Sequence, residues 1–213
     1  MLKNLHWLGH SSFRWDGAKI IYFDPWNIPD GSKESDIILI SHEHYDHFSK
    51  NDIAKISGPG TVFVCNKAVA SELEDAGIAA KNIRELSASR TAEINGVKIR
   101  AVASYNIGKP YHPKEAGKLG FIVTMGGISV YHAGDTDKIP EMKDVSCDIA
   151  LLPVSGTYVM TVKEAAEAAM VLKPKVAVPM HYGSIVGHAK DGEEFKRLLE
   201  GKVDVGLLKK EDM

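Results

Sequence analysis

The sequence predicts an α/β fold with two β-sheets whose outer faces are covered by helices. Short segments of strand character alternate with helix signals in both halves of the chain. A length of 213 residues suits one domain with a large core. No Pro/Gly/Ser-rich linker and no internal repeat divides the chain, so we expect a single domain over residues 1–213.

The expected strands are short runs rich in β-branched and aromatic residues. Asp16-Gly17 indicates a hairpin turn between the second and third runs, and Gly126-Gly127 indicates another. The later apolar runs are typical of strands buried on both faces. The expected strands are Lys3–Leu8, Ser12–Trp15, Lys19–Phe23, Ile37–Ile40, Thr61–Cys65, Val97–Ala103, Gly120–Thr124, Ile128–Tyr131, Ile149–Leu152 and Val176–Pro179.

Four helices are expected between and after these strands. Ser49 and Asn66 are candidate N-caps of the first two, and Thr161 with Glu164 forms a capping box for the third. The fourth covers roughly residues 191–200. The third helix is expected to bury one stripe of side chains, formed by Ala165, Ala166, Ala169 and Met170.

Composition and charge exclude several classes of function. The formal net charge is −2 and the sequence pI is about 6.5, so no basic field recruits nucleic acid. No apolar run is long enough to span a bilayer, and the first ten residues lack the layout of a signal peptide. Cys65 and Cys147 lie in strand-like stretches, which predicts buried free thiols and favours a cytoplasmic location. These features leave a small-molecule substrate as the expected partner and specify no oligomeric state.

Potential metal ligands gather directly after the strand Ile37–Ile40, in the segment SHEHYDH. Residues two apart in an extended chain point the same way, so His42 and His44 can bind one metal together. Asp46 and His47 lie on the following turn, where they can face a second ion. Imidazole and carboxylate suit zinc, and also iron or manganese. The alternative, a polar strand-to-helix loop with chance histidines, leaves this density of ligands unexplained.

The segment HEHYDH resembles the HxHxDH signature of the metallo-β-lactamase superfamily. Three other pieces occur in the superfamily's order: Asp24 in FDP, Asp135 in YHAGDT and His181 in PMHY. The resemblance extends from about Leu5 to Tyr182. It implies an αββα sandwich of the metallo-β-lactamase type, with the metals at one edge of the two sheets.

The opening HWLGHS and the YHAGDT segment are similar to a small stand-alone branch of that superfamily. This branch includes predicted metal-dependent hydrolases and ascorbate-lactone hydrolases, and it is similar in fold to N-acyl-phosphatidylethanolamine phospholipase D. The resemblance implies two divalent ions, with zinc expected and manganese or iron as alternatives, that activate water for hydrolysis. It implies that Asp135 bridges the ions and that Asp46 and His181 complete the second site. Asp24 would support a ligand histidine, with a turn-forming role as the alternative.

One ligand of the superfamily pattern is missing at its usual position. The strand Val97–Ala103 runs into Ser104-Tyr105-Asn106, where the pattern has a histidine. We expect His112, in a loop stiffened by two prolines, to reach the first metal instead. The alternatives are Asn106 or Tyr105 at the ion, or water there with His112 acting on the substrate.

Other residues are expected around the metals. His10 is expected beside them as a substrate-binding or supporting group, with a structural turn histidine as the alternative. Tyr158 follows a buried strand and is expected to border the pocket, unless it only packs its loop onto the body. His132 is expected to be buried and to bond a backbone carbonyl. Glu43 is expected to face solvent or to be structural.

The loop that follows the strand Val97–Ala103 carries three lysines, Lys109, Lys114 and Lys118. If this loop folds over the pocket, its charge favours an anionic substrate. The alternative is a solvated surface loop.

The predicted function is hydrolysis of a small ester, lactone or phosphodiester at a two-metal centre. One alternative is a non-catalytic metal- or ligand-binding protein on the same fold, which the full ligand set disfavours. Another is redox chemistry at a di-iron pair, which the lack of a flavin partner domain disfavours.

Overall fold

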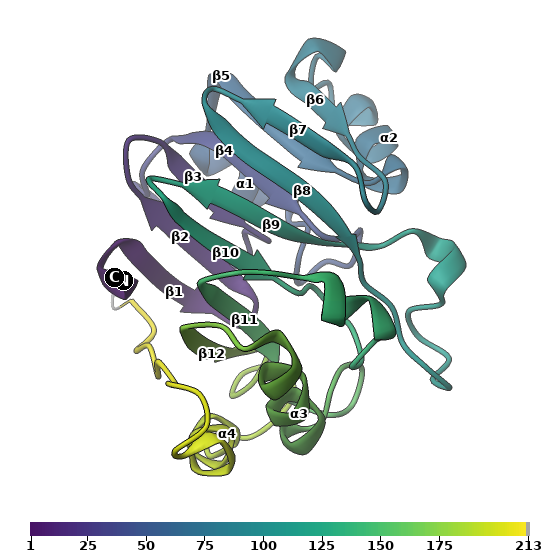
Figure 1. The fold of residues 1–213 in the computed structure, drawn as a ribbon. Coiled ribbons are helices and arrows are strands. Elements are labelled where there is room, and N and C mark those ends of the chain that lie inside the picture. Colours follow the sequence, from purple (N-terminus) through teal and green to yellow (C-terminus); the bar gives the residue numbers. More distant parts are fainter. Residues whose placement is uncertain (212–213) are drawn as a thin grey trace.

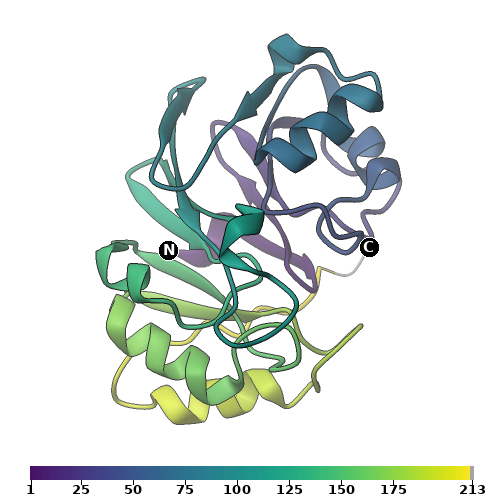
Figure 2. The ribbon, with the colours of Figure 1, turned by 90° about the vertical axis from the view of Figure 1, so that its right-hand side faces the viewer.

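The computed structural model describes residues 1–211, which form two six-stranded sheets packed face to face. Helices cover the outer face of each sheet, and the two sheets lie between the two groups of helices (Figure 1 and Figure 2). The αββα arrangement predicted from the sequence is confirmed.

The first sheet contains the first six strands in the order of the sequence. They are β1 (Leu5–Gly9), β2 (Ser12–Asp16), β3 (Ile20–Phe23), β4 (Ser35–Ile40), β5 (Ser57–Cys65) and β6 (Ile83–Glu85). The first three strands pair antiparallel, and β3 to β6 pair parallel. Helices α1 (Lys50–Ile56) and α2 (Lys67–Asp75) connect the parallel strands and cover this sheet (Figure 1).

The second sheet has the order β12-β11-β10-β9-β8-β7. Its strands are β7 (Thr91–Ile94), β8 (Val97–Ala103), β9 (Leu119–Met125), β10 (Ile128–His132), β11 (Ile149–Pro153) and β12 (Val176–Met180). Strands β10 to β12 pair parallel, and the others pair antiparallel. Helices α3 (Val162–Leu172) and α4 (Asp191–Leu199) pack on its outer face. Short 3-10 helices cover Leu2–Asn4, Ala80–Asn82, Lys114–Ala116 and Pro140–Asp144.

Strand β4 shows how the sequence pattern creates two cores. Ile37 and Leu39 belong to the core between the sheets, whereas Ile38 and Ile40 pack under α1 and α2. All four side chains are fully buried. Burial of each contributes about 1.5–3 kcal/mol, which fixes the register of the strand that leads into the HEHYDH segment.

The expected N-caps are confirmed. The backbone N–H groups of Asp52 and Val69 donate to the side chains of Ser49 and Asn66, at 3.3 Å and 3.0 Å. Thr161 and Glu164 form the capping box of α3.

The expected buried stripe of α3 is wrong at Met170, which is 37% exposed. Successive helical residues are rotated by about 100°, so the buried face runs through Ala165, Ala168 and Leu172 instead. Strands β6 and β7 have no counterpart in the sequence prediction, because both are short and largely exposed and therefore lack an apolar run.

Cys65 is buried and Cys147 is half-buried, and both are free thiols within residues 1–211. Burial raises the pKa of each thiol to about 12, so neither is a reactive thiolate at neutral pH. In this part of the chain no helix has the length and apolarity required to cross a bilayer.

Candidate metal centre

The ends of several strands meet at one edge of the two sheets. His10 follows β1, Asp24 follows β3, and the HEHYDH segment follows β4. From the second sheet, Asp135 follows β10 and His181 follows β12. His10, Asp24 and His181 have positive φ angles of 51°, 42° and 60°. Such backbone strain costs about 1–3 kcal/mol per residue and is concentrated at functional sites.

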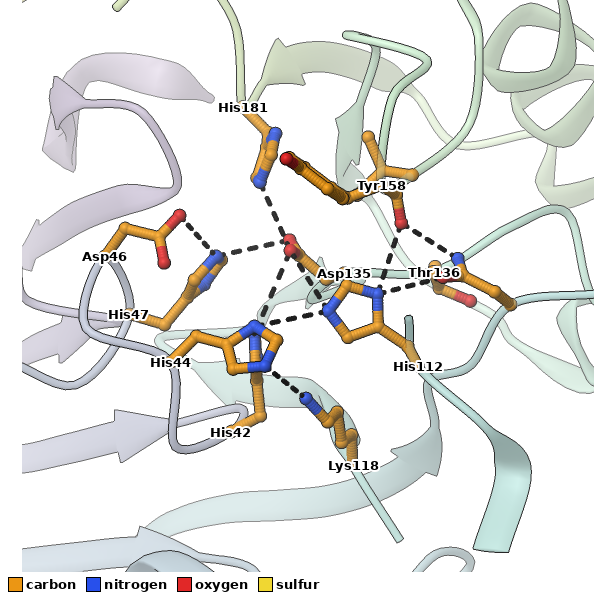
Figure 3. Close-up of polar contacts among 12 residues, drawn as sticks. His42, His44, Asp46, His47, His112, Lys118, Asp135, Thr136, Tyr158 and His181 are labelled. Atoms are coloured by element: carbon orange, nitrogen blue, oxygen red, sulfur yellow. Dashed lines mark hydrogen bonds and ion pairs between the residues drawn. The ribbon is translucent and has the colours of Figure 1, made fainter. Parts of the chain in front are cut away.

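The first group of candidate ligands comprises His42, His44, His112 and Asp135 (Figure 3). His44 Nδ1 lies 3.1 Å from His42 Nε2 and 3.4 Å from His112 Nε2. His112 Nε2 lies 3.7 Å from Asp135 Oδ2. Ligands at 2.0–2.1 Å from a tetrahedral zinc lie roughly 3.3 Å from one another, so this spacing suits one ion.

The second group comprises His10, Asp46, His47 and His181. His47 Nε2 lies 3.6 Å from Asp46 Oδ2 and 3.3 Å from Asp135 Oδ1. His181 Nε2 lies 3.2 Å from Asp135 Oδ2. Asp135 therefore lies between the two groups, as Figure 3 shows.

Several buried polar atoms point into this centre without a hydrogen-bond partner among residues 1–211. They are Nε2 of His47, Nε2 of His181 and Oδ1 of Asp135. An unpaired buried polar atom costs about 1–3 kcal/mol, and most such atoms in proteins have a partner. Divalent metal ions would satisfy all three, so the residues fit a metal centre.

Four of the candidate ligand histidines have the same orientation. In each, Nδ1 lies within hydrogen-bond distance of an oxygen outside the ligand groups, which leaves Nε2 to face the centre. This contact fixes the ring and its tautomer. The pairs are His42 with Ser41 Oγ at 2.9 Å, His47 with Asp24 Oδ2 at 2.7 Å, His112 with Asn106 Oδ1 at 2.9 Å, and His181 with Ser155 Oγ at 2.9 Å.

His44 has the opposite orientation, with Nδ1 toward the centre. Its Nε2 lies 3.1 Å from the Nζ of Lys118, a lysine that is only 4% exposed (Figure 3). Lys118 also forms an ion pair with Glu43 at 3.3 Å. Lys118 is therefore not on a solvated surface, which was one alternative for its loop, and Glu43 has the structural role that was one of its two expected roles. Lys118 is drawn inward because the next residue, Leu119, donates its backbone N–H to the Ser41 carbonyl at the start of the metal segment.

Asp24 and Asn106 support the ligands from outside. Asp24 accepts hydrogen bonds from the Ser41 backbone N–H at 2.7 Å and the Ser41 hydroxyl at 2.6 Å, in addition to its contact with His47. Asn106 holds His112, rather than approaching the first ligand group itself. Its own amide donates to Asp137 at 3.2 Å. Sequence reasoning missed Asp137, whose signal was its place two residues after Asp135.

Burial and charge set the ionisation of the ligands. Burial disfavours the charged form of His47, but Asp135 and Asp24 outweigh it and raise the pKa of His47 well above its usual value. Burial also works against ionised Asp135, yet His181 and His47 lower the pKa of that carboxyl well below its usual range. Burial lowers the pKa of His112 to about 4. Asp135 is thus an ionised carboxylate and His112 a neutral imidazole, the forms that bind metal, whereas metal binding at His47 would have to displace a proton.

His10 lies beside the second group. Its Nε2–H donates to Asp46 Oδ2 at 2.9 Å, and its carbonyl accepts from the backbone N–H of His181 at 3.0 Å. Burial lowers the pKa of His10 to about 4. Burial opposes ionisation of Asp46, but the His10 hydrogen bond prevails and lowers the pKa of Asp46 to about 2. His132, by contrast, donates from Nε2 to the Ser11 carbonyl at 2.8 Å, as expected.

A pocket of about 600 Å³ opens over both ligand groups. Tyr158 borders it, and its ring meets that of Tyr111 edge to face at 4.6 Å. The backbone carbonyl of Tyr158 accepts from His112 Nδ1 at 3.2 Å (Figure 3). The residues that line the pocket are Glu43, His44, Tyr45, Asp46, Tyr111, His112, Asp135, Tyr158, His181, Ile185 and Val186.

The loop after β8 does not present its lysines to the pocket, which was the condition for favouring an anionic substrate. Lys109 donates to Asp137 at 2.5 Å, Lys114 donates to Glu141 at 2.7 Å, and Lys118 is buried beside His44. Each ammonium group is held by the protein's own groups, so none lines the pocket.

Comparison with known proteins agrees with this geometry. The profile of the beta-lactamase superfamily domain matches residues 4–181. The chain belongs to the metallo-β-lactamase superfamily. Within it, a UPF0173 metal-dependent hydrolase from Pyrococcus abyssi is 35% identical over 95% of this chain and 94% of its own length. The chain is therefore a member of the UPF0173 family of metal-dependent hydrolases.

Solved structures give the same result. A protein from Parabacteroides distasonis, described as a metal-dependent hydrolase, is 34% identical with a TM-score of 0.83, over 96% of this chain and 93% of that one. The metallo hydrolase Igni18 from Ignicoccus hospitalis is 26% identical with a TM-score of 0.79, over 98% and 95% of the two chains. The narrower likeness to ascorbate-lactone hydrolases or to the phospholipase D stays a prediction.

Proposed function

We propose that this UPF0173 member hydrolyses a small ester, lactone or phosphodiester at a dinuclear metal centre, with zinc as the metal. His42, His44 and His112 would hold one ion, and Asp46 with His181 part of the other. His47 would complete the second site, and Asp135 would bridge the two. The observation that carries the proposal is the position of Asp135, whose two carboxylate oxygens face both ligand groups.

Bound divalent ions would supply Lewis acidity and would lower the pKa of a coordinated water toward roughly 7. The protein's own groups hold this chemistry in place. His10 orients Asp46 through the 2.9 Å hydrogen bond and keeps that carboxylate turned toward the second group. The pKa of about 2 keeps Asp46 ionised at neutral pH, so it can also accept a hydrogen bond from the attacking water.

The donor set supports zinc over harder metals. The proposed ligands comprise five imidazoles and two carboxylates, and imidazole-rich sites favour zinc, copper, iron or nickel over magnesium or calcium. Tyr158 lines the pocket and would contact the substrate rather than the metals. The same ions can polarise a carboxylic or a phosphoric ester, so the reacting bond is to be found by testing both.

The experiment is metal analysis of the purified protein, combined with turnover of a lactone, a thioester and a bis-aryl phosphate at matched metal loading. We expect two ions per chain and turnover of at least one substrate class. Asp135→Ala should reduce the metal content and should lower turnover at least 100-fold, because one carboxylate serves both ions. Asp144→Ala, which removes an exposed carboxylate, is the matched control and should change neither.

Other outcomes would identify the alternatives. Two ions bound without turnover on any ester would favour a non-catalytic metal-binding protein. An iron-specific absorption band with redox activity would favour di-iron chemistry. Full activity in Asp135→Ala would refute the two-metal mechanism.

A further inference from the structure

The residues that line the pocket include two chemically different groups. One group consists of candidate metal ligands, and the other consists of apolar and aromatic residues. We refer to the second group as the apolar wall, which consists of Tyr45, Tyr111, Tyr158, Ile185 and Val186.

The apolar wall is unusual for a protein surface. Within residues 1–211, seven large apolar side chains are exposed, and three of them, Tyr45, Tyr111 and Ile185, line this one pocket. They are 66%, 47% and 40% exposed. They come from three separate segments: the metal motif, the loop after β8 and the loop after β12. Exposed apolar residues that gather in one cavity mark a binding surface.

Two of the carboxylates that line the pocket already have partners within the protein. Glu43 forms an ion pair with Lys118, and Asp46 accepts a hydrogen bond from His10. No lysine or arginine is among the residues that line the pocket in the described part of the chain. An anionic group on the substrate would thus meet no protein cation at the apolar wall, and it would lose its hydration there without compensation.

The wall is held in a fixed shape. The Tyr111 and Tyr158 rings meet at 88°, and the Tyr158 backbone carbonyl accepts hydrogen bonds from His112 and from the Asn106 amide, the latter at 2.9 Å. On the other side, the loop that carries Ile185 is tied to α4, because Asp191 accepts from the backbone N–H of His188 at 2.7 Å. The wall therefore loses little conformational entropy when a ligand binds, which favours affinity.

We propose that the part of the substrate remote from the reacting bond is uncharged and apolar, an aryl or branched alkyl group seated on the apolar wall. The inference rests on the proposed function, because it places the reacting bond over Asp135. It names the substrate class as esters, lactones or phosphodiesters whose remote group is hydrophobic and uncharged, and it excludes substrates that carry an anionic group apart from the reacting one. A pocket of about 600 Å³ beside the candidate metal ligands suits a small molecule of this kind better than it suits a protein partner.

The test measures binding, not turnover. Hydroxamates bind metal ions through one end, so differences in affinity between them depend on how the other end contacts the apolar wall. Zinc-loaded protein is titrated by calorimetry with 4-tert-butylbenzohydroxamate and with 4-carboxybenzohydroxamate, with acetohydroxamate as the reference that has no ring. The tert-butyl compound should bind at least tenfold more tightly than the carboxylate. Ile185→Lys should reduce that preference at least fivefold, whereas Val171→Lys, an exposed apolar residue on α3, should leave it unchanged.

Two additions keep this test separate from the proposed function. The N-methylamides of the same two acids bind no metal strongly, and their binding to metal-free protein is followed by saturation-transfer NMR. The neutral amide should again be preferred. If the protein takes up no zinc and does not bind acetohydroxamate, the proposed function is refuted. The preference between the two amides would still test the inference about the apolar wall.

Two results would overturn the inference. One is equal or tighter binding of the carboxylate compounds by the wild-type protein. The other is an Ile185→Lys variant that keeps the wild-type preference but sediments as a monomer where the wild type is a dimer. That result would show that the wall is an interface between copies of the chain.

Discussion

Each of the five histidines proposed as metal ligands presents one nitrogen to its ligand group, because its other nitrogen is held by a group outside the centre. The holding groups differ: a serine hydroxyl for two rings, a carboxylate for His47, an amide for His112 and a lysine for His44. Loss of such an outer contact typically lowers metal affinity or activity by about 10–100-fold. The affinity of the centre therefore depends on residues that touch no metal.

Asn106→Ala tests this dependence most cleanly. Removal of the amide takes away the shorter of the two hydrogen bonds at His112 Nδ1 and leaves only the 3.2 Å contact with the Tyr158 carbonyl, so we expect zinc affinity to fall about 10–100-fold. Competition with a fluorescent zinc chelator measures the change. Asn106→Asp keeps an acceptor oxygen and should recover part of the affinity. Asn82→Ala, in which the lost amide bonded the Pro59 carbonyl, is the control. Equal affinity in Asn106→Ala and Asn82→Ala would contradict this role.

The candidate ligands on the continuous HEHYDH segment could be predicted from the sequence, whereas most of the residues that hydrogen-bond to the ligands could not. His42, His44, Asp46 and His47 follow from strand alternation and a turn, which are local properties. Asn106, Lys118 and Asp137 could not be found in this way, because their roles depend on how the loop after β8 folds back over the first sheet. His112 was expected to bind the first ion, and the structure places it in the first ligand group, but its role as a ligand stays a proposal.

At the scale of elements, the turn after β10 delivers Asp135 to the centre. Gly134 in this turn has a φ of 65°, and a Cβ there would lie 2.7 Å from the Leu119 carbonyl oxygen. The turn thus needs glycine for two reasons, its backbone conformation and the close approach of β9.

Gly134→Ala should therefore lower the free energy of unfolding by about 2–4 kcal/mol, through backbone strain and the clash with β9. Urea unfolding of the metal-free protein measures this loss. Gly127→Ala is the matched control, because its φ is 77° but no atom lies within 4 Å of the added Cβ. That variant should lose only about 1 kcal/mol. Equal losses in the two variants would show that the contact with β9 is unimportant.

Asp148 fastens β11 to the neighbouring β10. Its Oδ2 accepts from the Ser129 backbone N–H and hydroxyl, each at 2.8 Å, and its Oδ1 pairs with Lys175 at 2.8 Å. The Lys175 hydrogen bond and those from Ser129 lower the pKa of Asp148 to about 2. A depressed carboxyl pKa stabilises the fold above the unfolded value of about 3.9 and loses that effect as the pH falls toward 2.

Asp148→Asn should accordingly lower the Tm of metal-free protein at pH 7, on the order of 2–4 °C for the loss of about 1 kcal/mol. The difference from the wild type should narrow as the pH falls from 4 toward 2, because the wild-type carboxylate then becomes protonated. Thermal unfolding by circular dichroism across this range gives the comparison. A difference that stays constant down to the lowest pH at which the protein folds would show that the charge of Asp148 contributes nothing.

The strand and helix predictions succeeded where the pattern was local and strong. The apolar β4 and the capped α3 are examples, since burial and capping leave a clear signal in the sequence. Edge strands β6 and β7 left no such signal, because exposed strands need no apolar alternation. The position of α3 was predicted correctly, but its buried face was wrong at Met170.

At the scale of the whole molecule, the centre joins the two sheets. The first sheet contributes the HEHYDH segment, and the second contributes Asp135 and His181. No pattern within either half predicts that these strand ends meet. Their meeting was expected only from the resemblance to a family, and the αββα packing is what brings them together. Bound metal would therefore hold the sheets to each other as well as support chemistry.

The most direct test of the central claim is a crystal structure of the zinc-loaded protein with anomalous diffraction at the zinc edge. We predict two anomalous peaks about 3.5–4 Å apart. One should lie among His42, His44 and His112, the other among Asp46, His47 and His181, with Asp135 between them. Peaks absent from this edge of the sheets, or a single peak with the His112 ring well outside bonding distance, would contradict the dinuclear centre proposed for this chain.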